Sequence, residues 1–137
     1  MVRELVHDPL LLGVRSKPAA KDDRDTARDL LDTLRAHSET CVGMAANMIG
    51  RSVSIIAFSD NGRYTVMYNP AIIAGSAPYE TEEGCLSLLG GPRKTTRYKT
   101  IKVRYQDSGF VWRTQSYAGF TAQIIQHEVD HCNGVLI

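Results

Sequence analysis

Two histidines and a glutamate near the end of the sequence have the types and spacing of a metal-dependent hydrolytic site. The segment, residues 126–131, reads QHEVDH. Residues four apart on a helix share one face, so His127 and His131 can both direct a ring nitrogen at one ion. Glu128 lies beside them, where it can accept a proton from an attacking water. Ordinary helices also carry this pattern by chance, so it predicts a site only together with further ligands.

A third protein ligand is expected, because catalytic zinc-type sites use three protein ligands and keep one position open. Cys85, in the segment EGCLS (residues 83–87), is the best candidate, since a thiolate is a good ligand for zinc or ferrous iron. We expect Gly84 to let the backbone approach closely. A single cysteine in a β-rich region is commonly a small core residue. In combination with the two histidines, however, Cys85 favours a metal site.

Two helices are expected to flank the region that holds Cys85. Residues 22–37 show the i, i+3, i+4, i+7 apolar spacing of an amphipathic helix. Residues 119–132 form the second helix and carry both histidines, and Gly134 is well placed as its C-terminal cap. Residues 1–21 lack periodicity and are expected to form an extended arm on the body.

Between the helices the sequence favours antiparallel strands. Asn61-Gly62 is a strong two-residue hairpin signal, and Asp107-Ser108-Gly109 marks a second turn. Residues 88–97 are expected to be irregular. The expected strands are residues 52–58 with 63–68, a short strand at 71–74, and 98–105 with 110–116.

The order helix, antiparallel strands, helix indicates an α+β fold. We expect strands and hairpins packed around a C-terminal metal-binding helix, with an N-terminal helix. A length of 137 residues predicts one catalytic domain, residues 1–137.

The composition limits the kinds of binding partner that the protein can have and the cellular compartment in which it is expected. The chain is 43% hydrophobic and 23% charged with a net charge of +1, so nothing suggests a nucleic-acid partner. The N-terminus is a poor signal peptide, and no apolar run reaches the roughly 20 residues that span a bilayer. Three cysteines do not indicate a disulfide framework. We therefore expect a cytoplasmic protein without direct nucleic-acid or membrane binding.

Three segments together resemble the peptide deformylase family, whose members remove the formyl group from the N-terminal methionine of new bacterial polypeptides. The family carries a segment G-Φ-G-Φ-A-A-x-Q (Φ apolar), then EGCLS, then HExDH. This sequence has CVGMAANM at residues 41–48, EGCLS at 83–87 and HEVDH at 127–131. Their order and wide spacing also match, and the resemblance covers about residues 8–137.

The resemblance implies a metal centre with a defined acid/base. Cys85, His127 and His131 would bind one divalent ion, ferrous iron in the cell, which zinc or nickel can replace. Glu128 would take a proton from the attacking water and pass it to the leaving amine. The backbone N–H of Leu86 would point at the formyl oxygen as it becomes an oxyanion.

The resemblance also implies a substrate site for N-formylated peptides, among them nascent chains at the ribosome. Gly43 would flank the peptide backbone, which pairs with an extended edge there. Val42 and Ile124 would line an apolar methionine pocket. Asp130 would pair with Arg97 and would not touch the ion.

Two positions of the first segment depart from the family pattern. Cys41 replaces the first Gly, and Met48 replaces the Gln. The family Gln donates an N–H to the developing oxyanion, and a thioether cannot, which typically costs roughly a hundred- to a thousandfold in turnover. Asn47 is expected to face the opposite way on an extended chain. Gln123 is a hypothesis for a replacement donor or a polar pocket group.

Competing functions follow from the exchange at residue 48. The leading reading is a metal-dependent hydrolase that removes formyl groups from N-formylmethionyl peptides of newly made proteins. The alternative is a weakly active or non-catalytic deformylase-like protein that acts on, or binds, another N-acylated peptide or small amide. Glu128 argues against a pure binder, which has no evident need of a carboxylate there.

Overall fold

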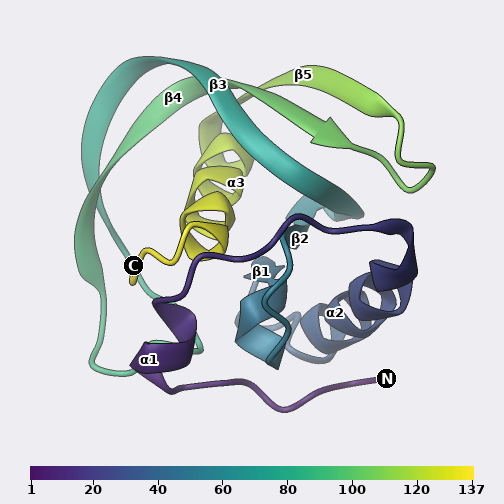
Figure 1. Ribbon diagram of the computed structural model, residues 1–137. Helices are drawn as coiled ribbons and strands as arrows, with labels where there is room; N and C mark the ends of the chain where they lie inside the picture. The colour runs from purple at the N-terminus through teal and green to yellow at the C-terminus, as the bar shows by residue number, and fades with distance from the viewer.

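A computed structural model describes residues 1–137 and contains one five-stranded antiparallel sheet in the order β1-β2-β3-β4-β5 (Figure 1). The helices are α1 (Pro9–Leu12), α2 (Arg24–Ala36) and α3 (Gly119–Cys132), with 3-10 turns η1 (Lys21–Asp23) and η2 (Ala46–Ile49). The strands are β1 (Gly43–Ala45), β2 (Ile55–Asp60), β3 (Arg63–Glu83), β4 (Arg93–Gln106) and β5 (Trp112–Ala118). The predicted α+β class and the C-terminal helix are confirmed.

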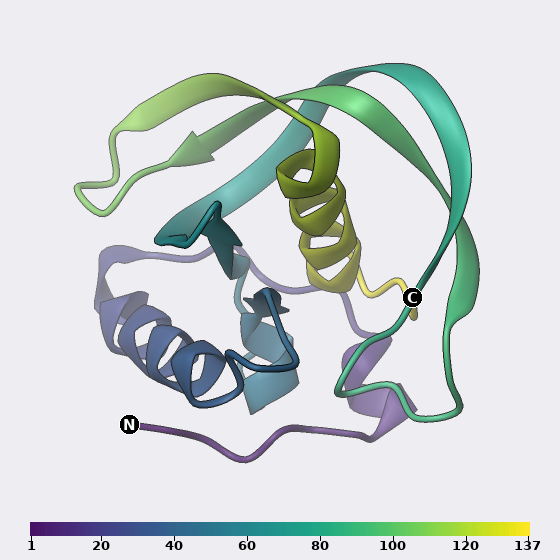
Figure 2. The ribbon, with the colours of Figure 1, turned by 180° about the vertical axis from the view of Figure 1, so that it is seen from behind.

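Helix α3 lies in the concave face of the sheet, with the long strands β3 and β4 arching over it (Figures 1 and 2). Its apolar side packs into a core with the strands, where Ile125, Val103 and Phe58 have no exposed surface. Each such side chain stabilises the fold by about 1.5–3 kcal/mol. This packing turns the opposite side of α3, which carries both histidines, toward the interior of the molecule.

Helix α2 packs against β1 and β2 and closes a second core. Leu30 and Leu34 from its predicted apolar stripe are fully buried in this core, together with Ile55 of β2. Residues 21–23, at the start of the predicted helix, form η1, which leads directly into α2. The N-terminal helix is therefore confirmed, with its first turn wound as a 3-10 helix.

The C-terminal end of α3 is fixed by Gly134, which has a left-handed φ of +76°. The N–H of Gly134 donates to the His131 carbonyl at 3.0 Å, and the N–H of Val135 donates to the Asp130 carbonyl at 2.9 Å. This is a Schellman motif, so the predicted cap is confirmed. A Cβ at Gly134 would lie 2.7 Å from the carbonyl oxygen of Gly13, where the N-terminal arm crosses the helix end.

The β2–β3 hairpin is confirmed, but β3 is much longer than the predicted returning strand. Asn61 and Gly62 have φ of 52° and 91°, as a type I′ turn requires. β3 then continues to Glu83, so the predicted end at Asn69-Pro70 and the separate strand at 71–74 are both wrong. The register of β3 against β4 shifts between Tyr68 and Ala71. Such a bulge accommodates Pro70, which cannot donate to the ladder.

Three further strand boundaries, and one whole strand, also differ from the sequence-based expectation. Residues 88–97 were expected to be irregular, and this prediction is wrong for the second half of the segment, because β4 begins at Arg93. The strand β1, which pairs with β2, was not predicted, because three residues cannot show a period. The strand expected at 52–58 begins only at Ile55, and the strand expected at 110–116 begins at Trp112 because Phe110 has a φ of 60°.

The N-terminal arm lies along the body as predicted, although it includes the unpredicted short helix α1. The Val6 N–H donates to the Met48 carbonyl at 2.7 Å, and the Ser16 N–H donates to the Cys132 carbonyl at 2.8 Å. The arm therefore joins η2 to the end of α3.

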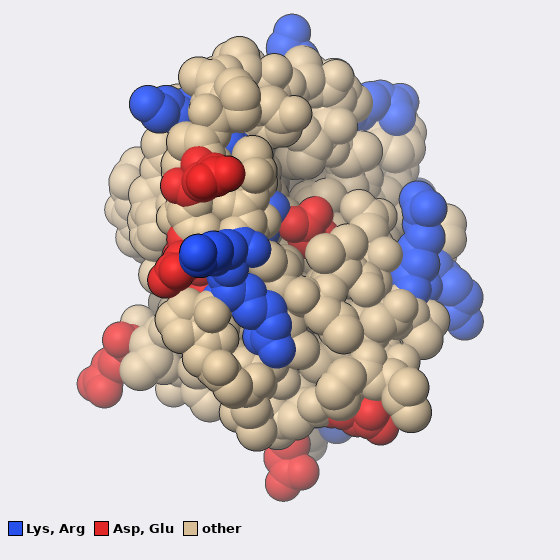
Figure 3. All heavy atoms as spheres, turned by 90° about the vertical axis from the view of Figure 1, so that its left-hand side faces the viewer, with Lys and Arg blue, Asp and Glu red and all other residues tan.

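Charge is dispersed on the face shown in Figure 3, where acidic and basic side chains are interspersed over a mostly uncharged surface. None of the helices combines the length and the apolar character needed to cross a membrane.

Candidate active site

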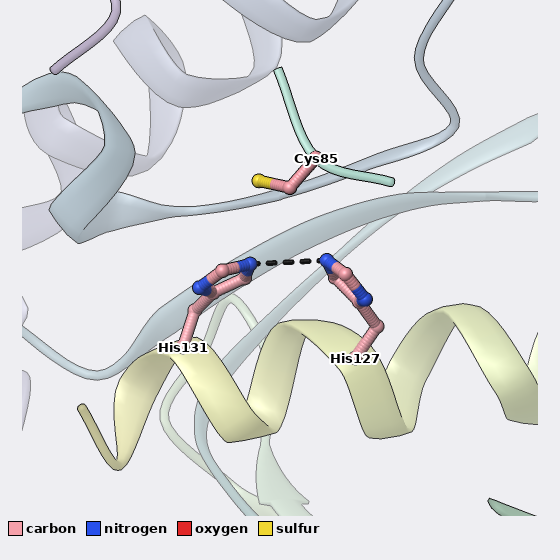
Figure 4. A group of neighbouring side chains, drawn as sticks. All are labelled: Cys85, His127 and His131. Atoms are coloured by element: carbon pink, nitrogen blue, oxygen red, sulfur yellow. Dashed lines mark hydrogen bonds between the residues drawn. The ribbon is translucent and has the colours of Figure 1, made fainter. Parts of the chain in front are cut away.

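The three predicted metal ligands converge at one point between α3 and the β3–β4 connection (Figure 4). The ligand atoms of Cys85, His127 and His131 all lie within 4.8 Å of one another. The Nε2 atoms of His127 and His131 face each other at 3.0 Å. Two nitrogens bound tetrahedrally to one zinc-sized ion are about 3.4 Å apart, so the two rings need only a small outward movement to share an ion. Two nitrogens and one sulfur suit zinc or ferrous iron.

Glu83 holds the His127 ring from the side away from the ligand point. Its Oε1 lies 2.8 Å from Nδ1 of His127, which turns Nε2 of that ring toward the other ligands. The Arg97 guanidinium donates to Glu83 at 2.7 Å and to Asp130 at 2.6 Å, so the predicted Arg97–Asp130 pair is present. Burial opposes ionisation of Glu83, but hydrogen bonds from His127 and Arg97 lower its pKa to about 2.

The two histidines differ in their electrostatic environments. Burial, and then the charge on His127, lower the pKa of His131, so this ring is neutral at pH 7 and its Nε2 accepts from Nε2 of His127. Burial also disfavours charge on His127, but contacts with Cys85 and Glu83 outweigh it and raise its pKa. Binding of a cation at the two Nε2 atoms therefore displaces a proton from His127.

Glu128 has the environment of a general acid/base. Its side chain is buried and its Oε1 has no hydrogen-bond partner. Burial is the largest effect and raises the pKa of Glu128 to about 7, close to the value at which proton transfer is most efficient at neutral pH.

Gly43, and not Gly84, is the glycine that allows a close approach. A Cβ on Gly43 would lie 2.7 Å from Cγ2 of Ile124 and 2.9 Å from Oε2 of Glu128, so β1 passes directly against α3. A Cβ on Gly84 would meet nothing within 4 Å, so Gly84 does not bring the backbone against another segment of the protein.

A cleft of about 510 Å³ opens onto these groups. The exposed Phe120 lies at the cleft and was not predicted as part of the site. The backbone N–H of Leu86 has no backbone acceptor. The residues predicted for substrate and oxyanion contacts all line the cleft: Val42, Gly43, Leu86, Gln123 and Ile124.

Met48, the residue that departs from the family Gln, also lines the cleft and is 1% exposed. Its thioether accepts a hydrogen bond from the Ala45 N–H at 3.4 Å, and it offers no donor to the cleft. Asn47 lies on η2 and not on an extended chain, and its amide donates to the His131 carbonyl at 2.8 Å. Asn47 is therefore turned to α3 and does not replace the missing donor.

Gln123 is turned toward Glu83. Its Nε2 donates to Glu83 Oε2 at 2.8 Å, and Glu83 in turn lies behind His127. The amide is therefore separated from the ligand point by two hydrogen bonds and one imidazole ring. This geometry does not support Gln123 as a replacement oxyanion donor.

Cys41, the second departure from the family pattern, also lines the cleft. Its thiol donates to the Gly43 carbonyl at 3.0 Å, and burial is the main cause that raises its pKa to about 12. Cys41 therefore remains a neutral thiol and does not compete with Cys85 as a ligand.

A Cys-His-His cluster with a buried glutamate beside it, at the floor of a cleft, is an arrangement typical of metal-dependent hydrolases. Residues 5–137 match the family described as polypeptide deformylase, and the chain belongs to this family of hydrolases.

Relatives and solved structures agree over nearly the whole chain. The chain is 51% identical to a peptide deformylase of Clostridium beijerinckii over 137 residues, which is 100% of both chains. A Met-Ala-Ser-bound class I type b peptide deformylase of Acinetobacter baumannii has a TM-score of 0.88 at 26% identity, with 99% of this chain and 96% of that chain covered. The peptide deformylase of Thermotoga maritima has a TM-score of 0.87 at 30% identity, with 99% and 94% covered.

Proposed function

We propose that residues 1–137 act as one catalytic domain that removes the formyl group from the N-terminal methionine of newly made polypeptides in the cytoplasm. The observation that carries this proposal is the convergence of Cys85, His127 and His131 beside Glu128 in a chain of the deformylase family. The Acinetobacter relative supports it, because its crystal structure holds Met-Ala-Ser, the peptide left when formyl-Met-Ala-Ser loses its formyl group.

One divalent ion, ferrous iron in the cell, would be held by Cys85, His127 and His131, and when bound it supplies a Lewis acid and a nucleophile at neutral pH. Glu128, which is buried and has no hydrogen-bond partner at Oε1, takes the proton of the attacking water and delivers it to the leaving amine. The Leu86 N–H donates to the formyl oxygen as negative charge develops on it.

The cleft also offers a place for the peptide. β1 is the edge strand of the sheet and Gly43 lines the cleft, so an extended substrate backbone would pair along β1. Val42 and Ile124 supply the apolar wall for the methionine side chain, and Gln123 supplies a polar wall.

Met48 lowers the expected turnover, because the oxyanion loses one donor. None of the relatives compared above supports the alternative, a protein that acts on or binds another N-acylated peptide or small amide. We therefore propose slow deformylation.

Turnover of formyl-Met-Ala-Ser tests the proposal. The nickel- or iron-loaded protein, kept anaerobic, is expected to release formate, and Glu128→Ala is expected to abolish release while it retains stoichiometric metal. Absence of turnover in both the wild type and Met48→Gln, each with one metal per chain, would contradict the proposal.

A further inference from the structure

We infer that Gln123 is a positioning residue, which holds the Glu83 carboxylate in the orientation that fixes the His127 ring and thereby slows loss of the metal. The inference rests on the metal site proposed above and concerns a residue that lines the substrate cleft.

The two oxygens of Glu83 have different partners. Oε1 receives Nη2 of Arg97 at 2.7 Å and lies 2.8 Å from His127 Nδ1. Oε2 receives the Gln123 amide at 2.8 Å and shares Nε of Arg97 at 3.1 Å. The short hydrogen bond to Oε2 therefore comes from Gln123, and it opposes rotation of the carboxylate that would carry Oε1 away from His127.

The position of Gln123 on α3 makes this contact possible. It precedes His127 by four residues, one helical turn, so both side chains lie on the same face. Glu83, Arg97 and His127 are all at least nine-tenths buried, whereas Gln123 is half-buried at the cleft wall. Gln123 therefore stands between Oε2 and the water of the cleft.

A purely structural role does not account for this placement. The opposite side of α3 is already anchored by the fully buried Ile125 and Ala122 in the sheet core. Loss of the half-buried Gln123 amide removes little from that core, but it leaves Oε2 of the buried Glu83 with one shared hydrogen bond. The Glu83 carboxylate is then held less firmly in its orientation, and so is the His127 ring that it contacts.

The first test is release of zinc to a chromophoric chelator. Loss of a direct partner of a metal-bound histidine typically weakens binding 10- to 100-fold; because Gln123 acts one hydrogen bond further away, we expect roughly three- to tenfold faster release from Gln123→Leu. Phe120→Leu is the matched control, because Phe120 lines the same cleft but gives no hydrogen bond to Glu83, and its zinc release should equal that of the wild type. Thermal unfolding of the metal-free variants checks that both fold.

The second test asks whether Gln123 acts through Glu83. In the zinc-loaded protein the Nδ1 proton of His127 is expected to exchange with solvent faster in Gln123→Leu than in the wild type, as measured by proton NMR. In a Glu83→Gln background the substitution Gln123→Leu should add no further increase in zinc release.

The outcomes separate this inference from the proposed function. A wild type that binds no zinc, or binds it equally well after His131→Ala, overturns the metal site itself. A wild type that binds zinc normally, with equal release and equal Nδ1 exchange in Gln123→Leu, overturns only the role of Gln123.

Discussion

Met48 is one of two cleft residues that depart from the family pattern, and it is the one that removes a hydrogen-bond donor. Its thioether accepts from the Ala45 N–H and cannot donate to an oxyanion. We expect Met48→Gln to raise kcat for formyl-Met-Ala-Ser roughly tenfold or more, up to the hundred- to thousandfold effect of one oxyanion donor. The measurement is steady-state kinetics of the nickel-loaded variants.

Met48→Leu provides the control for this prediction, because it keeps the apolar volume without adding a donor. Its kcat should remain at the wild-type value. Equal kcat in Met48→Gln and Met48→Leu would mean that the donor is not missing from the reaction. Because Met48 is buried, the new amide is also expected to cost about 1–3 kcal/mol of stability if it finds no partner.

At the residue scale the sequence was sufficient to predict that Cys85, His127 and His131 come together, and insufficient for the residues that contact them. His127 and His131 could be paired from helical spacing alone, and Cys85 could be added from its type. Glu83 was visible only as part of a motif, because its contact with His127 spans 44 residues and depends on where β3 ends. Gln123 was placed near the metal, but the direction of its amide depends on Glu83 and could not be derived from helical spacing.

At the scale of elements, α3 depends on the turn at Gly134 for its end and for its contact with the arm. Gly134→Ala is expected to destabilise the fold, because a left-handed φ costs an L-residue about 1–2 kcal/mol and the new Cβ would clash with the Gly13 carbonyl. Chemical denaturation measures the change in the free energy of unfolding.

Gly62→Ala separates the cost of the left-handed φ from the cost of the clash with the Gly13 carbonyl. Gly62 also has a positive φ, of 91°, but a Cβ there meets nothing within 4 Å. It should therefore show the conformational cost alone. If Gly134→Ala is no more destabilising than Gly62→Ala, the contact between the arm and α3 is not tight.

Elements with a strong period were predictable and the others were not. α2 buries one side, so its apolar spacing was readable, whereas α3 is buried on nearly all sides and was recognised by its apolar residues and the glycine at its end. The second half of β3, residues 74–83, is largely exposed on both faces and is held by backbone pairing with β4, so it carries no alternation. β1 could not be predicted for a different reason, since its three residues are all buried and too few to show a pattern.

At the scale of the whole molecule, the proposed metal site joins two parts of the fold, the β3–β4 connection and α3, that do not share a hydrophobic core. Cys85 lies on the β3–β4 connection, whereas His127 and His131 lie on α3. A bound ion therefore stabilises the folded state, by about 4 kcal/mol when free zinc exceeds its dissociation constant a thousandfold. We expect the Tm to fall when a chelator removes zinc.

Cys85→Ala tests whether this stabilisation comes from the proposed site. With one ligand absent, the Tm of this variant should respond much less to added zinc than that of the wild type. A wild-type Tm that does not change between zinc-loaded and chelator-treated protein would argue that the ligands do not hold an ion together.

The contact between the N-terminal arm and α3 affects the stage of translation at which this protein can finish folding. During translation the arm and Cys85 emerge before α3, yet Ser16 bonds to Cys132 and Cys85 faces two histidines of α3. Until the ribosome has released that helix, Ser16 near the end of the arm lacks its partner and the thiol has no histidines beside it. Docking of the arm is therefore completed, and the metal centre assembled, only after every strand has been synthesised.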